Sequence, residues 1–166
     1  DRLKAATGAG AVIRIMPNLP ALIAQGVSGL YASPDCTDAQ KTAVETLMQR
    51  AGTTVWVGDE DALDRVTAVA GSGPGYVFEI ARTYIAAAEA LGFTNDQARA
   101  LVLGTMAGAV EMARQSDETV EALRNSVTSK NGTTQAGLEA LNADGTLSEL
   151  LLRTTQAAYD RAVELR

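Results

Sequence analysis

The hydrophobic pattern of this 166-residue chain changes character once, close to Gly58. Before that residue, three short, largely apolar runs predict strands at 12–16, 26–32 and 53–57. Beyond it, apolar residues recur at helical spacing and no further strand is indicated. The pattern therefore predicts an α/β segment over 1–58 that is followed by an all-α segment over 59–166.

Local signals place the elements of the first segment. The run at 12–16 is almost continuously apolar, which is typical of a strand buried on both faces of a sheet, and prolines at 17 and 20 end it. Thr37 and Gln40 predict a capping box at the start of a helix that ends at Gly52. One face of that helix carries Ala39, Ala43, Leu47 and Ala51. The order strand, strand, helix, strand suits the closing part of a larger sheet.

The second segment divides into helices at glycine-rich turns and capping signals. A helical pattern at 59–70 is interrupted by Gly71-Ser72-Gly73-Pro74, and we expect Pro74 to be the first residue of the next helix, capped by Ser72 or Gly73. Thr94 with Gln97, and Thr146 with Glu149, predict two further capping boxes. The predicted helices cover 74–91, 95–114, 117–125, 133–142 and 147–165. Those at 74–91 and 98–113 are rich in Ala and Gly, so we expect burial on more than one side, within a self-contained helical core or against another subunit.

Composition excludes several classes of function. The chain has no histidine and one cysteine, Cys36, so it offers neither an ordinary zinc site nor a disulfide framework, and we expect no metal. A net charge of −6 without a basic cluster disfavours nucleic acid and anionic membranes as partners. No apolar run approaches the roughly 18 residues of a membrane span. We expect a cytoplasmic protein that binds a small metabolite and associates with itself.

Three segments are candidates for that binding site. In the run 127–138, hydroxyl and glycine residues lead into an apolar, helix-forming stretch, which predicts a helix start whose N–H groups and hydroxyls hold a carboxylate or a phosphate. The turn at 71–75 has the same design, and the loop at 16–20 follows a predicted strand, where α/β sheets place ligands. Each segment alone is equally well explained by ordinary helix capping or by a rigid loop.

Taken together and in this order, the three segments resemble the pyrroline-5-carboxylate reductase family. They read M-P-N-x-P at 16–20, G-S-G-P-x-Y at 71–76 and V-T-S-x-x-G-T-T-x-A-G-L at 127–138. The resemblance implies an α/β remnant of a Rossmann-type domain, the C-terminal part of a dinucleotide-binding domain, over 1–58. It implies an all-α helical dimerisation and substrate-binding domain over 59–166, interleaved with its twin in a homodimer and in some members assembled further.

The implied reaction is hydride transfer from NADPH or NADH to the C=N bond of 1-pyrroline-5-carboxylate, which gives L-proline. Carried over by position, Ser129 and the backbone N–H groups of Gly132, Thr133 and Thr134 would bind the substrate carboxylate. The Thr134 hydroxyl is the catalytic candidate, because it would approach the ring nitrogen to orient the imine or relay a proton. The nicotinamide side would be lined, mostly through backbone groups, by Met16, Pro17, Asn18, Ser72, Gly73 and Pro74.

The chain lacks one part of the family pattern and departs from it at three positions. It contains no G-x-G-x-x-G between a strand and a helix, and it opens like the end of a helix under way, so we expect a fragment that is inactive alone. Lys130 and Asn131 stand where the family usually has Pro and Gly, and Leu19 stands where it commonly has Thr. We expect Asn131 to keep a left-handed turn. Lys130 either strengthens carboxylate binding or points to solvent.

Asp117 occupies a position that is often acidic in the family, at the start of the helix predicted near 117–125, although a first-turn partner of the helix dipole explains it as well. Two other functions stay open at this point. One is a related two-domain dehydrogenase for another small imino or keto acid. The other is a non-catalytic helical dimerisation fragment.

Overall fold

The computed structural model describes residues 2–165, which form two compact units. Unit 1 holds the described residues up to Tyr76 together with those from Arg153 onward, and unit 2 holds Val77–Leu152. This grouping reflects packing, and the predicted domains 1–58 and 59–166 stay a prediction. Within the described residues, no helix is long and apolar enough to cross a membrane.

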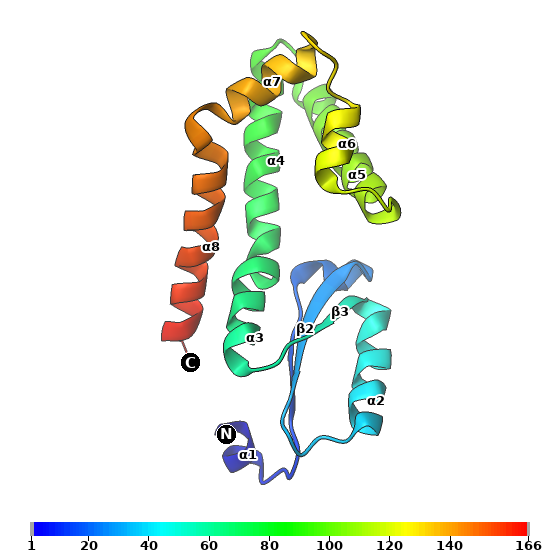
Figure 1. Ribbon diagram of the computed structural model, residues 1–166, viewed down its shortest axis with the longest axis vertical. Coiled ribbons are helices and arrows are strands. Elements are labelled where there is room, and N and C mark those ends of the chain that lie inside the picture. The colour runs from blue at the N-terminus through cyan, green and yellow to red at the C-terminus, as the bar shows by residue number, and fades with distance from the viewer. Residues whose placement is uncertain (1, 166) are drawn as a thin grey trace. The chain divides into compact units, whose positions relative to one another are not determined.

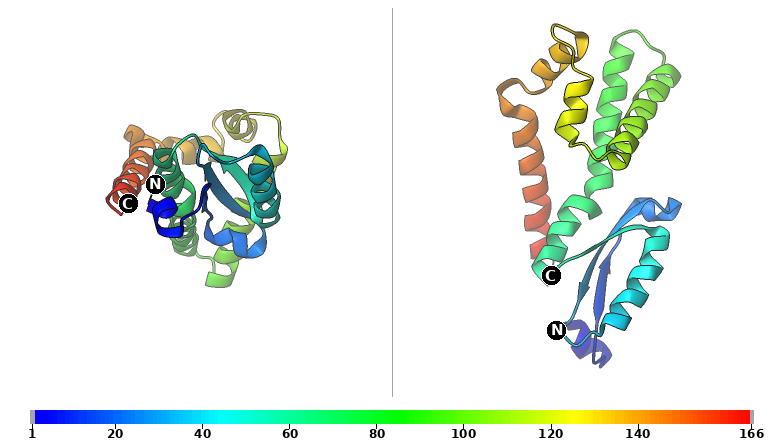
Figure 2. Two further views of the ribbon diagram at one scale, coloured as in Figure 1. Left: turned by 90° about the horizontal axis from the view of Figure 1, so that it is seen from below. Right: turned by 45° about the vertical axis from the view of Figure 1, so that its right-hand side comes forward.

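Unit 1 is built on a three-stranded sheet in the order β1-β2-β3. Strand β1 (Ile13–Met16) pairs antiparallel with β2 (Gly26–Ala32), which pairs parallel with β3 (Gly52–Trp56). Helix α2 (Asp38–Met48) covers one face of the sheet and α3 (Glu60–Val66) covers the other (Figures 1 and 2). The three predicted strands and both flanking helices are therefore confirmed.

The sheet and α3 approach each other closely at a glycine. A Cβ atom on Gly29 would overlap the side chain of Val66, so the absence of one lets α3 lie directly on β2. On α3, Leu63 is buried, and in β2 Leu30 is fully buried. The core of unit 1 is thus centred on β2.

One prediction about burial in unit 1 is wrong. Strand β1 is only partly buried, and its Ile15 is 39% exposed, because β1 pairs with a single neighbour among the described strands. The capping box of α2 is present, but its face containing Leu47 is exposed. The helix instead turns its Val44–Glu45 side toward the sheet, where Glu45 accepts a hydrogen bond of 3.2 Å from the Thr54 hydroxyl of β3.

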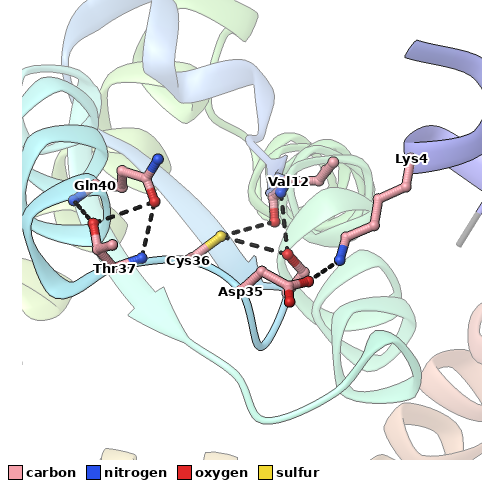
Figure 3. A network of polar contacts seen from close by, with 7 residues as sticks. Lys4, Val12, Asp35, Cys36, Thr37 and Gln40 are labelled. Carbon is pink, nitrogen blue, oxygen red and sulfur yellow. Dashed lines mark hydrogen bonds and ion pairs between the residues drawn. The ribbon is translucent and has the colours of Figure 1, made fainter. Parts of the chain in front are cut away.

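Polar contacts tie the turn after β2 to the beginning of β1 (Figure 3). The Val12 N–H donates to the Ser33 hydroxyl at 3.1 Å, and the Cys36 thiol donates to the Val12 carbonyl at 3.4 Å. Lys4 of α1 (Arg2–Thr7) forms an ion pair with Asp35, and this hydrogen-bonded partner lowers the pKa of Asp35. The single cysteine is thus part of the scaffold of unit 1.

Unit 2 contains an antiparallel helix pair with a small core of its own. Helix α4 (Gly73–Ala90) enters it from unit 1 and turns at Gly92, where φ is +103°, into α5 (Asn95–Gln115) (Figure 2). The shorter helices α6 (Val120–Ser126) and α7 (Thr133–Leu141) follow, and α8 (Thr146–Glu164) leads back to unit 1. Three short 3₁₀ turns cover Leu19–Ile23, Gln49–Ala51 and Ala143–Gly145.

The helix pair buries one side only. Its core consists of Ala88, Ala98 and Val102, with Ile85 and Met106 packed against it. Large apolar side chains on the same two helices stay exposed, among them Phe78 (60%), Val110 (60%) and Met112 (63%). Burial on more than one side, as predicted, is therefore not achieved within a single chain.

The two predicted capping boxes of the helical segment have different outcomes. At the start of α5, Thr94 and Gln97 exchange both hydrogen bonds of the box. At the start of α8 the prediction is wrong, because Thr146 already has helical backbone angles and its hydroxyl donates to the Ala143 carbonyl. Left-handed conformations at Asp144 and Gly145 make the reversal that leads directly into α8.

One tyrosine couples α8 to α3 within unit 1 and predicts a pH dependence. The Tyr159 hydroxyl donates to Asp61 at 2.8 Å, and this hydrogen bond raises the pKa of Tyr159. Asp61 is also paired with Arg65. A group whose pKa is raised on folding stabilises the folded state fully at a pH below its unfolded pKa, which is about 10 for tyrosine. This stabilisation is lost as the pH rises through the pKa of the folded state. Thermal midpoints of wild type and Tyr159→Phe should differ at pH 8 and converge above pH 10; a constant difference would contradict this coupling.

Candidate functional site

The loop between α6 and α7 is a tight turn that its own backbone holds. The Thr128 N–H donates to the Asn125 carbonyl and the Thr128 hydroxyl donates to the Arg124 carbonyl, at 3.0 and 2.7 Å. The Gly132 N–H donates to the Ser129 carbonyl at 3.0 Å. Asn131 has φ of +59°, so the left-handed conformation predicted for it is confirmed.

Helix α7 begins on this turn without a side-chain cap. Gly132 is its N-cap residue, and no side chain accepts from the first N–H groups of the helix. The N–H groups of Thr133 and Thr134 have no intrahelical acceptor, because they belong to the first turn. The Gln135 side chain binds the preceding Asn131 N–H at 2.7 Å, which fixes the turn and leaves the helix start open. An open helix start attracts an anion through its N–H groups and its dipole.

Hydroxyl groups surround this helix start. Ser129, Thr133 and Thr134 are exposed, and their side chains have no hydrogen-bond partner among residues 2–165. A Cβ atom on Gly132 would overlap the Ser129 hydroxyl, so glycine at this position makes room for it. Lys130 is exposed at the same turn, and all four predicted substrate-binding residues thus belong to one surface.

The two other predicted segments meet each other in unit 1. The chain leaves β1 at Met16, whose methyl group a Cβ atom on Gly71 would overlap. Asn18 binds two separate elements: its carboxamide oxygen accepts from the Val27 N–H of β2 at 2.8 Å, and its nitrogen donates to the Ala70 carbonyl at 3.0 Å. Of the predicted cofactor-binding residues, Met16 and Asn18 therefore adjoin the turn that carries Ser72, Gly73 and Pro74, whereas Pro17 is exposed beside them.

The helical pattern is not interrupted at 71–74 by a capped turn, as predicted, but by a π-helical turn that ends at Gly71. Residues Thr67–Gly71 make a π-helical turn, in which the Ser72 N–H donates to the Thr67 carbonyl at 2.9 Å. Ser72 has helical backbone angles, so it is not an N-cap, and α4 begins at Gly73 with Pro74 second. Single π-helical turns are found frequently at functional sites.

Two partners of Asn18 escaped sequence reasoning, Val27 of β2 and Ala70 of the turn, whereas Tyr76 is part of the G-S-G-P-x-Y motif. The Tyr76 hydroxyl donates to the Ala68 carbonyl at 3.2 Å, within the π-helical turn. The available signal was the spacing of Ala70 and Pro74, because a proline four residues on cannot donate to that carbonyl. Asp117 precedes α6 by three residues and is exposed, so it does not begin that helix as predicted.

Two observations concern other kinds of site in the described chain. Among residues 2–165, no group of three or more His, Cys, Asp or Glu side chains is arranged to hold a metal ion. A cavity of about 500 Å³ lies between α2 and the ends of β2 and β3, lined by Lys41 and Trp56 among others, and contains none of the predicted residues.

Comparisons with known proteins agree with the resemblance noted in the sequence. Residues 60–165 match the family described as pyrroline-5-carboxylate reductase dimerisation. A pyrroline-5-carboxylate reductase of Pseudomonas aeruginosa is 42% identical over 154 residues, which cover 93% of this chain and 56% of the relative. The chain thus spans little more than half the length of the curated relatives it matches.

Solved structures share the fold. A pyrroline-5-carboxylate reductase of Coxiella burnetii superposes with a TM-score of 0.91 at 38% identity, over 93% of this chain and 57% of that protein. The Plasmodium falciparum enzyme, solved with NADP bound, superposes with a TM-score of 0.86 at 26% identity, over 97% of this chain and 64% of that protein. The predicted fold class, a Rossmann-type remnant followed by a helical dimerisation domain, is confirmed. The chain belongs to the pyrroline-5-carboxylate reductase dimerisation family.

Proposed function

We propose that the full-length protein carrying this chain is a pyrroline-5-carboxylate reductase, which reduces the C=N bond of 1-pyrroline-5-carboxylate to give L-proline. The observation that carries the proposal is the open start of α7, where hydroxyl groups with no partner among residues 2–165 surround unoccupied N–H groups. Such a site fits the carboxylate of a small substrate. Relatives that are 34 to 42% identical to this chain are named as reductases of this type.

In this proposal the turn at 129–134 holds the substrate carboxylate. The Ser129 hydroxyl and the N–H groups of Thr133 and Thr134 donate hydrogen bonds to it, and the dipole of α7 adds attraction. The Gly132 N–H already donates to the Ser129 carbonyl. Gly132 therefore contributes to the site by having no side chain, which leaves room for the Ser129 hydroxyl. Lys130 adds a positive charge at the rim of the site.

Thr134 is proposed to act on the ring nitrogen of the substrate. A hydroxyl is a poor general acid at neutral pH, so its role is to orient the imine and to relay a proton from water. The substrate imine is protonated, one hydride adds to its carbon, and the nitrogen lone pair of the amine product is formed from the electrons of the C=N bond. Positioning rather than proton transfer by the protein is then the main contribution to rate.

NADPH or NADH supplies the hydride when bound, with NADP supported by the ligand of the Plasmodium relative. We assign the nicotinamide end of such a cofactor to unit 1, where a Cβ atom on Gly73 would meet nothing within 4 Å, so that the backbone there is accessible to a ligand. Within unit 1 we assign the nicotinamide to Met16, Pro17, Asn18, Ser72, Gly73 and Pro74, mostly through their backbone groups. Residues 1–166 contain no G-x-G-x-x-G between a strand and a helix, so these residues alone should bind NADPH weakly in a calorimetric titration.

The same proposal covers domains and assembly. Residues 1–58 are the C-terminal part of the dinucleotide-binding domain, and 59–166 form the domain that binds substrate and dimerises. Exposed apolar side chains on α4 and α5, together with the name of the matched family, support a homodimer through interleaved helices. Light scattering after size-exclusion chromatography should give twice the chain mass. We place the protein in the cytoplasm.

A substrate panel tests the proposed reaction. The full-length protein, with saturating NADPH or NADH, should consume cofactor with 1-pyrroline-5-carboxylate and should release proline. Preference for an open-chain keto acid would indicate a related dehydrogenase instead. Absence of turnover with every imine and keto acid tested would overturn the assignment as a reductase.

A pair of glycine variants tests the carboxylate site. Gly132→Ala is expected to raise KM for 1-pyrroline-5-carboxylate about fivefold, because the added methyl displaces the Ser129 hydroxyl and removes one hydrogen bond of about 1 kcal/mol. Gly137→Ala makes the same change inside α7, where a Cβ atom meets nothing within 4 Å, and should leave KM unchanged. Steady-state kinetics compare the two variants. Equal KM values would show that Ser129 does not bind the substrate carboxylate.

A further inference from the structure

The carbonyl of Ala70 lacks its usual helical donor. In an α-helix this oxygen would accept from the N–H of residue 74, but residue 74 is proline and has none. The next N–H along the chain, that of Gly75, donates to the Ser72 carbonyl at 2.9 Å. A partly buried carbonyl without a donor carries an energetic cost, so a donor from elsewhere is needed.

Asn18 supplies that donor from 52 residues away. Its side-chain nitrogen lies 3.0 Å from the Ala70 oxygen, and its side-chain oxygen accepts from the Val27 N–H at 2.8 Å. Both ends of the carboxamide are therefore engaged inside unit 1. One side chain thus joins the loop after β1, strand β2 and the π-helical turn.

We propose that Asn18 is a positioning residue: it fixes the π-helical turn Thr67–Gly71 and thereby the backbone at 71–73 on the nicotinamide side of the site. This inference rests on the proposed reductase function. Because the side-chain nitrogen and oxygen of Asn18 are both engaged within unit 1, its side chain acts through the turn, and Asn18 lines the nicotinamide side only through its backbone. Tyr76 supports the same turn through the Ala68 carbonyl.

Asn18→Asp in the full-length protein separates the two hydrogen bonds. The substituted carboxylate can still accept from the Val27 N–H, but it cannot donate to Ala70 and faces its oxygen instead. We expect kcat to fall about fivefold, the loss of one neutral hydrogen bond, while KM for 1-pyrroline-5-carboxylate stays within about twofold. As the pH falls toward the pKa of the new carboxyl group, it regains an O–H donor and the ratio of wild-type to variant kcat should shrink.

Two further variants isolate the effect. Asn142 also donates from its side chain to a helix carbonyl, that of Leu138 at 2.8 Å, so Asn142→Asp removes the same kind of bond at another place and should leave kcat unchanged. Pro74→Ala restores an N–H that can reach the Ala70 carbonyl. Asn18→Asp should therefore lower kcat by a smaller factor in the Pro74→Ala background than in wild type.

The outcomes separate the inference from the function on which it rests. A wild-type protein without reductase activity would overturn the proposed function. If the wild type is active, three results would overturn the positioning role of Asn18. These are an unchanged kcat of Asn18→Asp, a change in KM alone, or the same fold-loss of kcat with and without Pro74. If Asn18→Asp is too unstable for kinetics, its unfolding free energy in the two backgrounds tests the Asn18–Ala70 link, and equal losses would refute it.

Discussion

Thr134→Ala in the full-length protein is expected to lower kcat/KM for 1-pyrroline-5-carboxylate tenfold or more. The Thr134 side chain is exposed and has no partner among residues 2–165, so its hydroxyl holds no part of this chain together. If that hydroxyl orients the ring nitrogen, its removal takes away one transition-state hydrogen bond worth about 1.4 to 3 kcal/mol. Steady-state kinetics and a thermal midpoint measured on the same sample separate loss of activity from loss of fold.

Matched variants sharpen this prediction. Thr83→Ala removes a hydroxyl that bonds only to carbonyls of its own helix, at 2.9 and 3.0 Å, and should leave kcat/KM unchanged. Thr134→Ser keeps the hydroxyl and should retain most of the activity. If Thr134→Ala is as active as wild type, the role assigned to this hydroxyl is wrong. That result would not bear on the proposed carboxylate site at Ser129.

Gly52→Ala is expected to destabilise the protein by about 3 kcal/mol or more. Gly52 has φ of +138° and ψ of −146°, a region of backbone conformation almost restricted to glycine, where strain costs about 1–3 kcal/mol. A Cβ atom there would also overlap the backbone of Gly26, its register partner in β2, and overpacking of this kind costs a further 1–3 kcal/mol or so. The parallel pairing of β2 and β3 begins at these two glycines.

Gly58→Ala is the matched control, because a Cβ atom at that position, two residues after β3, meets nothing within 4 Å. Urea unfolding of the full-length variants should show a lowered midpoint for Gly52→Ala and a change within about 0.5 kcal/mol for Gly58→Ala. Equal midpoints for the two variants would show that the strands shift to admit the methyl group.

Much of the fold follows from local signals in the sequence. Strands at 13–16, 26–32 and 52–56 follow from short apolar runs, and α2 and α5 begin where Thr37 and Thr94 form capping boxes. These signals succeed because each depends on residues close together in the chain. The left-handed turn at Asn131 is of the same kind, since Gly, Asn and Asp adopt this conformation most readily.

What could not be predicted depends on contacts between distant residues. The face of α2 that meets the sheet carries Glu45, which accepts a hydrogen bond from Thr54 of β3, and not the alanines along the helix. The π-helical turn before α4 depends on Asn18, because this side chain replaces the donor that Pro74 lacks. For the candidate site, sequence indicated which residues gather at the start of α7, but not that the Gly132 N–H is already used within the turn.

The division of unit 1 along the chain has a consequence for its synthesis. Its first part ends at Tyr76 and its second begins at Arg153, with all of unit 2 made in between. Asp61 and its partner Tyr159 are 98 residues apart. At a ribosomal rate of about 5–20 residues per second, α3 leaves the peptidyl transferase centre on the order of 5 to 20 s before α8 can reach it. During that interval the hydrogen bond between Tyr159 and Asp61 cannot form, so this side of α3 is accessible to chaperones.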